Sequence, residues 1–293
     1  MTEISFVIPV YHALEETKVC LRSIENIKER NKAEIIIVND CPGSKTSEFL
    51  HDYAKGHDVK LIDNPKNIGF IGSCNRGMML AQSSIVVLLN SDTEVPVSIV
   101  DKFVKCYNSD EKIACAGPLG SAIEKRAFVG DVNSADMCAE QKSGINKYID
   151  TLVPNGFCFG VRKSIINEIG GYDPIFGKGY CEENDLSYRA LKNGYRNVVI
   201  TDLFVLHKGS ASFGSNETRQ RIKENKKILN KRWGTFIKEY KKQNNELYKQ
   251  RIYIRRFYPW YMNFMFDLRK TIIKSILWAL PKSELKNKLK GLK

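Results

Sequence analysis

Short apolar runs alternate with amphipathic segments along the first hundred residues of the chain. The runs typical of strands cover 4–11, 34–40, 59–64 and 84–90. Between them, apolar residues recur at helical spacing over 14–30, 46–55 and 71–82. Strands that are almost continuously apolar are typically buried on both faces. The alternation therefore predicts an α/β fold with a mostly parallel central sheet flanked by helices.

The pattern changes after residue 95. Helices are predicted at 97–108, 163–169 and about 183–193, and strands at 113–117 and 152–163. Residues 118–150 are polar and weakly patterned, so no element is assigned to them. Residues 216–256 have the pattern of one or two highly charged helices. We therefore expect a main domain over 1–215 and a helical C-terminal extension over 216–293.

Three of the predicted strands end in residues suited to ligand binding. These strand ends are Pro9-Val10-Tyr11, Asn39-Asp40 and Asn90-Ser91-Asp92. A single Asp after a strand is most often a turn former. Ligands of open α/β sheets, however, bind beyond the carboxyl ends of the strands. The joint placement of Asp40 and Asp92 therefore favours a ligand site at that edge.

The charge of the chain is unevenly distributed. The 293 residues carry a net charge of +13, but residues 1–215 hold 24 Lys and Arg against 27 Asp and Glu, a net −3. Residues 216–293 hold 22 Lys and Arg against 6 Asp and Glu, a net +16. The main domain is therefore not built as a polyanion-binding surface.

The eight cysteines lie far apart in the sequence and form no CxxC pair, so a zinc knuckle is not expected. The chain enters a strand almost at once, without the pattern of a secretory signal. We therefore expect a reducing, cytoplasmic compartment. No run of eighteen uncharged apolar residues is present, so no transmembrane span is expected.

Three acidic residues open the helix predicted from about residue 183. Glu182, Glu183 and Asp185 fall in its first turn, where the helix dipole favours each by about 0.3–1 kcal/mol. A second explanation is a general base, because one carboxylate is enough to accept a proton and the preceding GKGY is a glycine-lined approach. The residues alone leave both explanations open.

One of only four histidines, His207, directly follows an apolar run. A lone histidine is more often a packed side chain than a metal ligand, and imidazole suits manganese or magnesium less well than oxygen ligands do. The glycine-rich segment 64–78 lacks GxGxxG spacing, and no GxxxxGK[ST] occurs in the chain. The fingerprints of dinucleotide and P-loop sites are therefore missing.

Seven stretches, in this order, resemble glycosyltransferase family 2, the inverting enzymes of the GT-A fold, which is Rossmann-like. They are VIPVY (7–11), IIVNDCPGSKT (36–46), NIGFIGSCNRG (67–77), LLNSDTEV (88–95), GFCFGVRK (156–163), GGYDPIFGKGYCEENDLSYRALKNGY (170–195) and VLHKGSASF (205–213). Each stretch is weak alone, but together they span nearly all of residues 4–215. Within that family, the stretches resemble those of bacterial rhamnosyl-, galactosyl- or N-acetylhexosaminyl-transferases of surface polysaccharides such as lipopolysaccharide and capsule.

The resemblance implies roles for particular residues. The nucleotide-sugar-binding residues would be Pro9, Tyr11 and Asp40 at the base and ribose, Asn67, Gly69 and Asn75 near the ribose and diphosphate, and Asn90 and Ser91. Asp92 stands at the last position of the family's metal-binding DxD motif, and His207 at a further metal contact. Glu183 falls at the position of the catalytic Asp, with Glu182 as the alternative if the register is shifted.

Two departures from the family pattern bear on the chemistry. Asn90 replaces the first Asp of the DxD motif, so the Mn²⁺ or Mg²⁺ that the resemblance implies would depend more on Asp92, His207 and the diphosphate. Glu183 replaces a shorter Asp. In the implied reaction the cation stabilises the departing nucleoside diphosphate. The carboxylate takes the proton of the acceptor hydroxyl, and a single displacement inverts the sugar.

The segment 255–293 combines apolar and aromatic residues with Lys and Arg at helical spacing. One interpretation is a helix packed on its own core or on a partner subunit. The other is a helix in the interface of an anionic membrane, at the inner face of the cell membrane, near a lipid-linked acceptor. Both interpretations, and the oligomeric state, stay open.

The expected function is transfer of a sugar from a nucleotide diphosphate sugar to a glycan or lipid-linked hydroxyl. One alternative is a non-catalytic or nucleotidyl-transferring relative with the same sheet. Another is a polyanion-binding protein acting through the basic tail. Nucleic-acid binding is disfavoured, because the aromatic residues of the tail follow a helical face rather than a base-stacking pattern.

Overall fold

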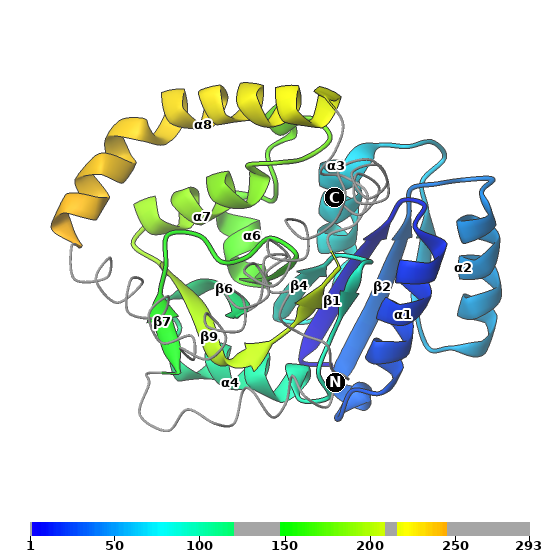
Figure 1. Cartoon of the computed structure of the whole chain (residues 1–293). Coiled ribbons are helices and arrows are strands. Elements are labelled where there is room, and N and C mark those ends of the chain that lie inside the picture. Colours follow the sequence, from blue (N-terminus) through cyan, green and yellow to red (C-terminus); the bar gives the residue numbers. More distant parts are fainter. Residues whose placement is uncertain (1, 120–146, 209–215, 245–293) are drawn as a thin grey trace, which may run out of the picture. The chain divides into compact units, whose positions relative to one another are not determined.

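A computed structural model of the chain describes residues 2–119, 147–208 and 216–244 (Figure 1). The first compact unit of the chain runs from Met1 to Gln243. It therefore includes the first helix of the basic region. The boundary expected at residue 215 stays a prediction, and the amphipathic segment 255–293 lies outside the described residues.

The first half of the chain forms four parallel strands joined by helices. In chain order the elements are β1 (Ile4–Val10), α1 (Leu14–Glu25), η1 (Arg30–Lys32), β2 (Ala33–Asn39), α2 (Lys45–Gly56), β3 (Lys60–Asp63), α3 (Gly69–Leu80) and β4 (Ile85–Leu89). β1 pairs in parallel with both β2 and β4, and β2 pairs in parallel with β3. The predicted α/β class is confirmed.

The second half extends the sheet with strands of both directions. The elements are β5 (Thr93–Glu94), α4 (Ile99–Ser109), β6 (Ile113–Leu119), β7 (Tyr148–Asp150), β8 (Cys158–Arg162), α6 (Lys163–Ile169), η3 (Pro174–Phe176), α7 (Glu182–Lys192), β9 (Arg196–Phe204), β10 (Leu206–His207) and α8 (Asn216–Gln243). The order of the eight-stranded sheet is β3-β2-β1-β4-β8-β6-β9-β7. In this eight-stranded sheet, β8 and β7 are antiparallel to the other six strands.

The sheet is buried on both faces, because alternate residues of each central strand enter different cores. Phe6 and Ile8 of β1 pack with α1, α2 and α4 on one face. Val7 packs with α3, α6, α7 and the buried side chains of α8 on the other. Such two-sided burial is the reason that β1, β2 and β4 are almost continuously apolar (Figure 1). It makes the sheet a rigid support for the residues at its carboxyl edge.

Two predicted boundaries are wrong, each for a tertiary reason. The helix predicted over 14–30 ends at Glu25, because the chain turns away to let the amide of Lys28 donate to the carbonyl of Val97. The strand predicted over 152–163 begins only at Cys158. Before it, Pro154 lacks an amide for a sheet ladder and packs closely on Gly117, where an added Cβ would lie 2.8 Å from Pro154 Cβ.

No helix in the described part of the chain is long and apolar enough to cross a membrane.

Candidate active site

The short antiparallel pair of β5 and β10 brings two distant segments together at the edge of the sheet. In its register His207 faces Thr93, and the amide of Lys208 donates to the carbonyl of Asp92. His207 Nε2 consequently lies 3.1 Å from Asp92 Oδ1 and 3.4 Å from Asn90 Nδ2. The two residues expected to bind metal, Asp92 and His207, are thus neighbours.

Phe157 holds this corner in place. Its ring stacks on His207 with centroids 4.7 Å apart and planes 16° from parallel. Its carbonyl accepts the amide of Asn90 at 2.9 Å. The side chains of His207 and Asp92 are only 11% and 17% exposed. Stacking, backbone pairing and burial together leave the imidazole little freedom to turn.

The polar atoms of this corner are not fully satisfied by one another. Asn90 Oδ1 is buried without a hydrogen-bond partner among the described residues. His207 Nε2 carries either a proton or a lone pair. With the proton it can donate to Asp92, and with the lone pair it can accept from Asn90 Nδ2, but it cannot do both at once. These three residues carry an amide oxygen, a carboxylate oxygen and an imidazole nitrogen, and the two oxygens are of the ligand types that manganese and magnesium prefer.

Protein ligands alone do not complete such a site. Within residues 2–119, 147–208 and 216–244, no three His, Cys, Asp or Glu side chains gather closely enough to hold a metal ion. The remaining ligands would have to come from a bound molecule or water.

Two carboxylates stand at the start of α7, as the sequence predicts. Glu182 is 6% exposed and Glu183 is partly buried. The Oε2 atom of each is buried and has no hydrogen-bond partner within the described part of the chain. Burial disfavours the ionised form of both carboxyls, while backbone amides of residues 180–184 donate to them and act in the opposite direction.

Both carboxyls ionise less readily than an ordinary glutamate. Burial raises the pKa of Glu183 above its ordinary value. Burial, and after it the charge of Glu183, raises the pKa of Glu182 well above its ordinary value. Because the two carboxyls are adjacent, a negative charge on one disfavours ionisation of the other.

Glu183 lies over the loop that precedes β8. A Cβ built on Gly156 would come within 3.2 Å of Glu183 Cγ and 3.5 Å of its Oε1. The residue after Gly156 is Phe157, which stacks on His207. Glu183 and the Asp92–His207 corner therefore contact adjacent residues of one dipeptide, Gly156-Phe157.

Asp40 is buried, and its carboxylate oxygens accept hydrogen bonds from other residues of the chain. It accepts hydrogen bonds from Asn64 Nδ2 at 2.9 Å and from the amides of Ile68 and Gly69 at 2.8 and 2.9 Å. Gly69 begins α3 with a φ of +81°, which favours glycine. Asp40 thus shapes the loop before α3, and contact of its side chain with a nucleotide stays a prediction.

Asn75 joins α3 to the turn before η3. Its Nδ2 donates to the carbonyl of Tyr172, and its Oδ1 accepts the amide of Tyr172, both at 2.8 Å. Asn67 is exposed. The role of either residue toward a ribose or diphosphate stays a prediction.

The other expected residues lie at the carboxyl edge as predicted. Tyr11 is 56% exposed just after β1, Ser91 is partly buried after β4, and Pro9 is buried in β1 opposite Val38 of β2.

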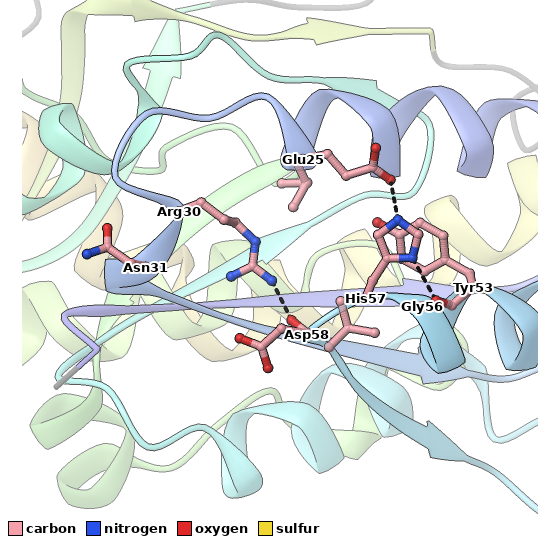
Figure 2. Close-up of a pocket in the computed structure, with 9 residues that line it drawn as sticks. Glu25, Arg30, Asn31, Tyr53, Gly56, His57 and Asp58 are labelled. Atoms are coloured by element: carbon pink, nitrogen blue, oxygen red, sulfur yellow. Dashed lines mark hydrogen bonds and ion pairs between the residues drawn. The ribbon is translucent and has the colours of Figure 1, made fainter.

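A pocket of about 510 Å³ lies elsewhere, beside the amino ends of β2 and β3 (Figure 2). In it the carboxylate of Glu25 faces His57 Nε2 at 3.4 Å, and the ring of His57 stacks on Tyr53. Arg30 donates to the carbonyls of Ala33 and Asp58. These polar groups engage one another, and none belongs to the candidate active site.

The comparisons with known proteins agree with this geometry. The family model described as Glycosyl transferase family 2 matches residues 5–170, more than half of the chain. A poly-beta-1,6-N-acetyl-D-glucosamine synthase of Staphylococcus epidermidis is 24% identical over 175 residues, which is 58% of this chain and 42% of that protein. The chain thus spans about half the length of the curated relatives it matches.

Solved structures show the same fold. A mannosyltransferase of Pyrobaculum calidifontis in complex with GDP-Man and Mn²⁺ superposes with a TM-score of 0.58 at 16% identity, over 75% of this chain and 60% of that one. S. aureus TarS in complex with UDP-GlcNAc superposes with a TM-score of 0.53 at 15% identity, over 78% of this chain and 67% of that one.

Proposed function

Because the chain belongs to glycosyl transferase family 2, we propose that it is an inverting, metal-dependent glycosyltransferase. It transfers a sugar from a nucleotide diphosphate sugar to a hydroxyl of a glycan or lipid-linked acceptor. The observation that carries the proposal is the meeting of Glu183 and the Asp92–His207 corner on the dipeptide Gly156-Phe157. Because these groups contact adjacent residues of one loop, a base and a cation site can act on one pair of bound donor and acceptor.

Glu183 is the proposed general base. Burial keeps its pKa above its ordinary value, against the opposing effect of the backbone amides that donate to it. A base whose pKa approaches the working pH accepts a proton most effectively in the transition state. Glu183 removes the proton of the acceptor hydroxyl as that oxygen attacks the anomeric carbon. A single displacement of this kind inverts the configuration.

Glu182 has a different part. Its side chain is 6% exposed, and burial raises its pKa. In its protonated form it adds no second negative charge beside the base. Because Glu183 is the carboxylate that lies against Gly156, Glu182 is not the proposed base.

Asp92, His207 and Asn90 are the residues that would hold the cation. When bound, Mn²⁺ or Mg²⁺ supplies a positive charge that stabilises the leaving diphosphate. The stacked ring of Phe157 keeps His207 Nε2 oriented toward Asp92. Mn²⁺ is present in the superposed mannosyltransferase structure, which supports this cofactor.

The donor is proposed from the relatives. The structures superposed here hold GDP-Man and UDP-GlcNAc, so a nucleoside diphosphate hexose is the proposed donor class. The similar synthase of S. epidermidis is named for a polysaccharide product, which supports an acceptor in bacterial surface polysaccharide. Attachment of residues 255–293 to the inner face of the cell membrane is part of this proposal and lies outside the described residues.

The test uses the full chain with a panel of UDP-, GDP- and dTDP-linked hexoses, with Mn²⁺ or with a chelator. We expect one donor to raise the melting temperature in a Mn²⁺-dependent way and to give sugar transfer or slow hydrolysis with inversion. Glu183→Gln is expected to keep the thermal shift and lose the transfer. Donor binding by the wild-type chain without any transfer would instead support a non-catalytic relative.

A further inference from the structure

The segment that leads into Glu182 has an unfavourable backbone. Gly177 and Gly179 have φ values of +65° and +132°, and Tyr180 and Cys181 both have +76°. For a residue with a Cβ, the left-handed conformation costs about 1–2 kcal/mol. Cys181 is also the N-cap of α7, where its side chain makes no capping hydrogen bond. The start of α7 is therefore held by contacts from outside the segment.

Asn225 of α8 supplies the most direct of these contacts. Its side chain is 5% exposed, and Nδ2 lies 2.9 Å from the carbonyl oxygens of Phe176, Gly179 and Tyr180. An amide group has two protons to donate, so it serves the three carbonyls by sharing. The side chain of Asn225 thus links three backbone carbonyls of the loop 176–180 to one another.

A second contact fixes α8 to the first turn of α7. Asp185 is fully buried and accepts hydrogen bonds from Arg232 and from Trp233 Nε1, both at 2.8 Å to Oδ1. Arg189, one turn further along α7, donates to Oδ2 at 2.9 Å. Because Asp185 holds α8 in register, Asn225 stays opposite the loop carbonyls.

The same loop also touches the donor side of the candidate site. An added Cβ on Gly69 would lie 3.2 Å from Lys178 Cγ, and the amide of Gly69 is independently held by Asp40. If the loop 176–180 becomes more mobile, Gly69 keeps its hydrogen bond to Asp40. The position of Glu183 is therefore expected to change more than that of Gly69.

We propose that Asn225 is a positioning residue of the transfer reaction: by bonding the backbone of 176–180, it keeps Glu183 against Gly156. The inference rests on the proposed function for its kinetic part. Asn225 touches neither of the reacting groups and acts through the backbone that precedes α7. It lies in α8, outside the residues 5–170 that match the family model.

The first variants are Asn225→Ala and Asn225→Asp. The second keeps the shape of the side chain but, as a carboxylate, donates no proton to the three carbonyls. Since an ångström of misplacement can cost about 100-fold in rate, we expect kcat to fall by about 10- to 100-fold in both variants. The KM for the donor is expected to stay within about threefold of wild type, because Asp40 still holds Gly69.

Two control variants separate positioning from folding. Asn230→Ala removes an exposed asparagine of the same helix and is expected to behave as wild type. Leu229→Ala removes buried packing of α8 but no bond to the loop. It is expected to lower the melting temperature while kcat stays near wild type. Equal loss of kcat in Leu229→Ala and Asn225→Ala, at equal loss of stability, would overturn the proposal.

A readout independent of activity comes from hydrogen exchange of the backbone amides of residues 177–184. We expect faster exchange there in Asn225→Ala and Asn225→Asp, and no change in Asn230→Ala. Wild-type exchange in both Asn225 variants would overturn the proposal even if their activity fell. If the wild-type chain transferred no sugar from any donor, the proposed function would fail, while this exchange experiment would still test the hold on the loop.

Discussion

Gly156 and Glu183 are in direct contact: the position of a Cβ on Gly156 is 3.2 Å from Glu183 Cγ and 3.3 Å from its Cδ. The contact joins the loop before β8 to the first turn of α7. Because Phe157 follows Gly156 and stacks on His207, the proposed base and the proposed cation site contact neighbouring residues of one loop. The absence of a side chain at Gly156 leaves room for the carboxylate of Glu183.

Adding one methyl group at Gly156 tests this contact. In Gly156→Ala the side chain of Glu183 must shift by a few tenths of an ångström, so we expect kcat to fall by about tenfold with unchanged donor affinity. Gly234→Ala is the control, because an added Cβ on Gly234 meets nothing within 4 Å. Steady-state kinetics and melting temperatures of both variants check the prediction, and wild-type kcat in Gly156→Ala would contradict it.

Replacing the proposed base should separate binding from chemistry. We expect Glu183→Gln to lose about 100-fold or more in kcat, while the donor dissociation constant measured by calorimetry stays near wild type. Glu182→Gln is expected to keep most of the activity, because Glu183 and not Glu182 is placed against Gly156. A larger loss in Glu182→Gln than in Glu183→Gln would assign the base to Glu182.

The pH dependence of kcat follows from the same carboxylate. Burial raises the pKa of Glu183, and only its ionised form accepts a proton. The activity is therefore expected to fall on the acid side at a pH above the ordinary range of a glutamate. A profile of kcat against pH measures this, and an acid limb at the ordinary carboxyl pKa would count against a buried base.

The stability of the protein should depend on Glu182 in a predictable direction. Since its pKa is raised by folding, the folded state binds more protons than the unfolded state between the ordinary and the raised pKa, and the free energy of unfolding falls as pH rises through that window. Glu182→Gln removes this penalty. We expect the variant to be more stable than wild type near neutral pH, by about 1 kcal/mol or more.

The difference should shrink as pH is lowered below the ordinary pKa of a glutamate, where both folded and unfolded wild-type chains are protonated. Urea unfolding of the two proteins at neutral and acidic pH measures it. A difference that is constant with pH would show that the gain comes from packing and not from ionisation.

Removing the proposed cation ligands should abolish metal-dependent donor binding. In Asp92→Ala and in His207→Ala we expect the Mn²⁺-dependent rise in melting temperature with the donor to disappear, because stabilisation by a ligand follows its affinity for the folded state. His57→Ala, at the distant pocket (Figure 2), is the control. Equal stabilisation by the donor in the presence of a chelator would contradict the role of Asp92 and His207.

The sequence predicted the sheet better than it predicted the ends of its elements. The apolar runs of β1, β2 and β4 come from burial on two faces, and this signal is local and strong. The end of α1 at Glu25 depends on a bond between Lys28 and Val97, two residues far apart in the chain. Local periodicity carries no information on such a contact.

For the candidate site, the sequence supplied the residue types and the edge on which they lie. Asp92 follows a buried strand and Glu183 opens a helix, and both positions were predicted. Phe157 and Asn225 were not predicted in any role. Phe157 stands among other apolar residues, and Asn225 lies in a charged helical run, where nothing local distinguishes it from Asn230.

By itself, the sequence determined which segments become strands and helices, because side-chain periods of two and 3.6 residues are written into neighbouring positions. It thereby also determined that Asp40, Asn90 and Asp92 stand at one edge of a sheet. Only the tertiary structure decided which distant groups meet there. Asn90 and His207, 117 residues apart, are joined by the pairing of β5 with β10, and Glu183 is set against Gly156 by a loop that α8 holds. Such contacts arise when whole helices and strands pack together. The free energy of that packing is spread over many residues, so no single position in the sequence indicates the contact.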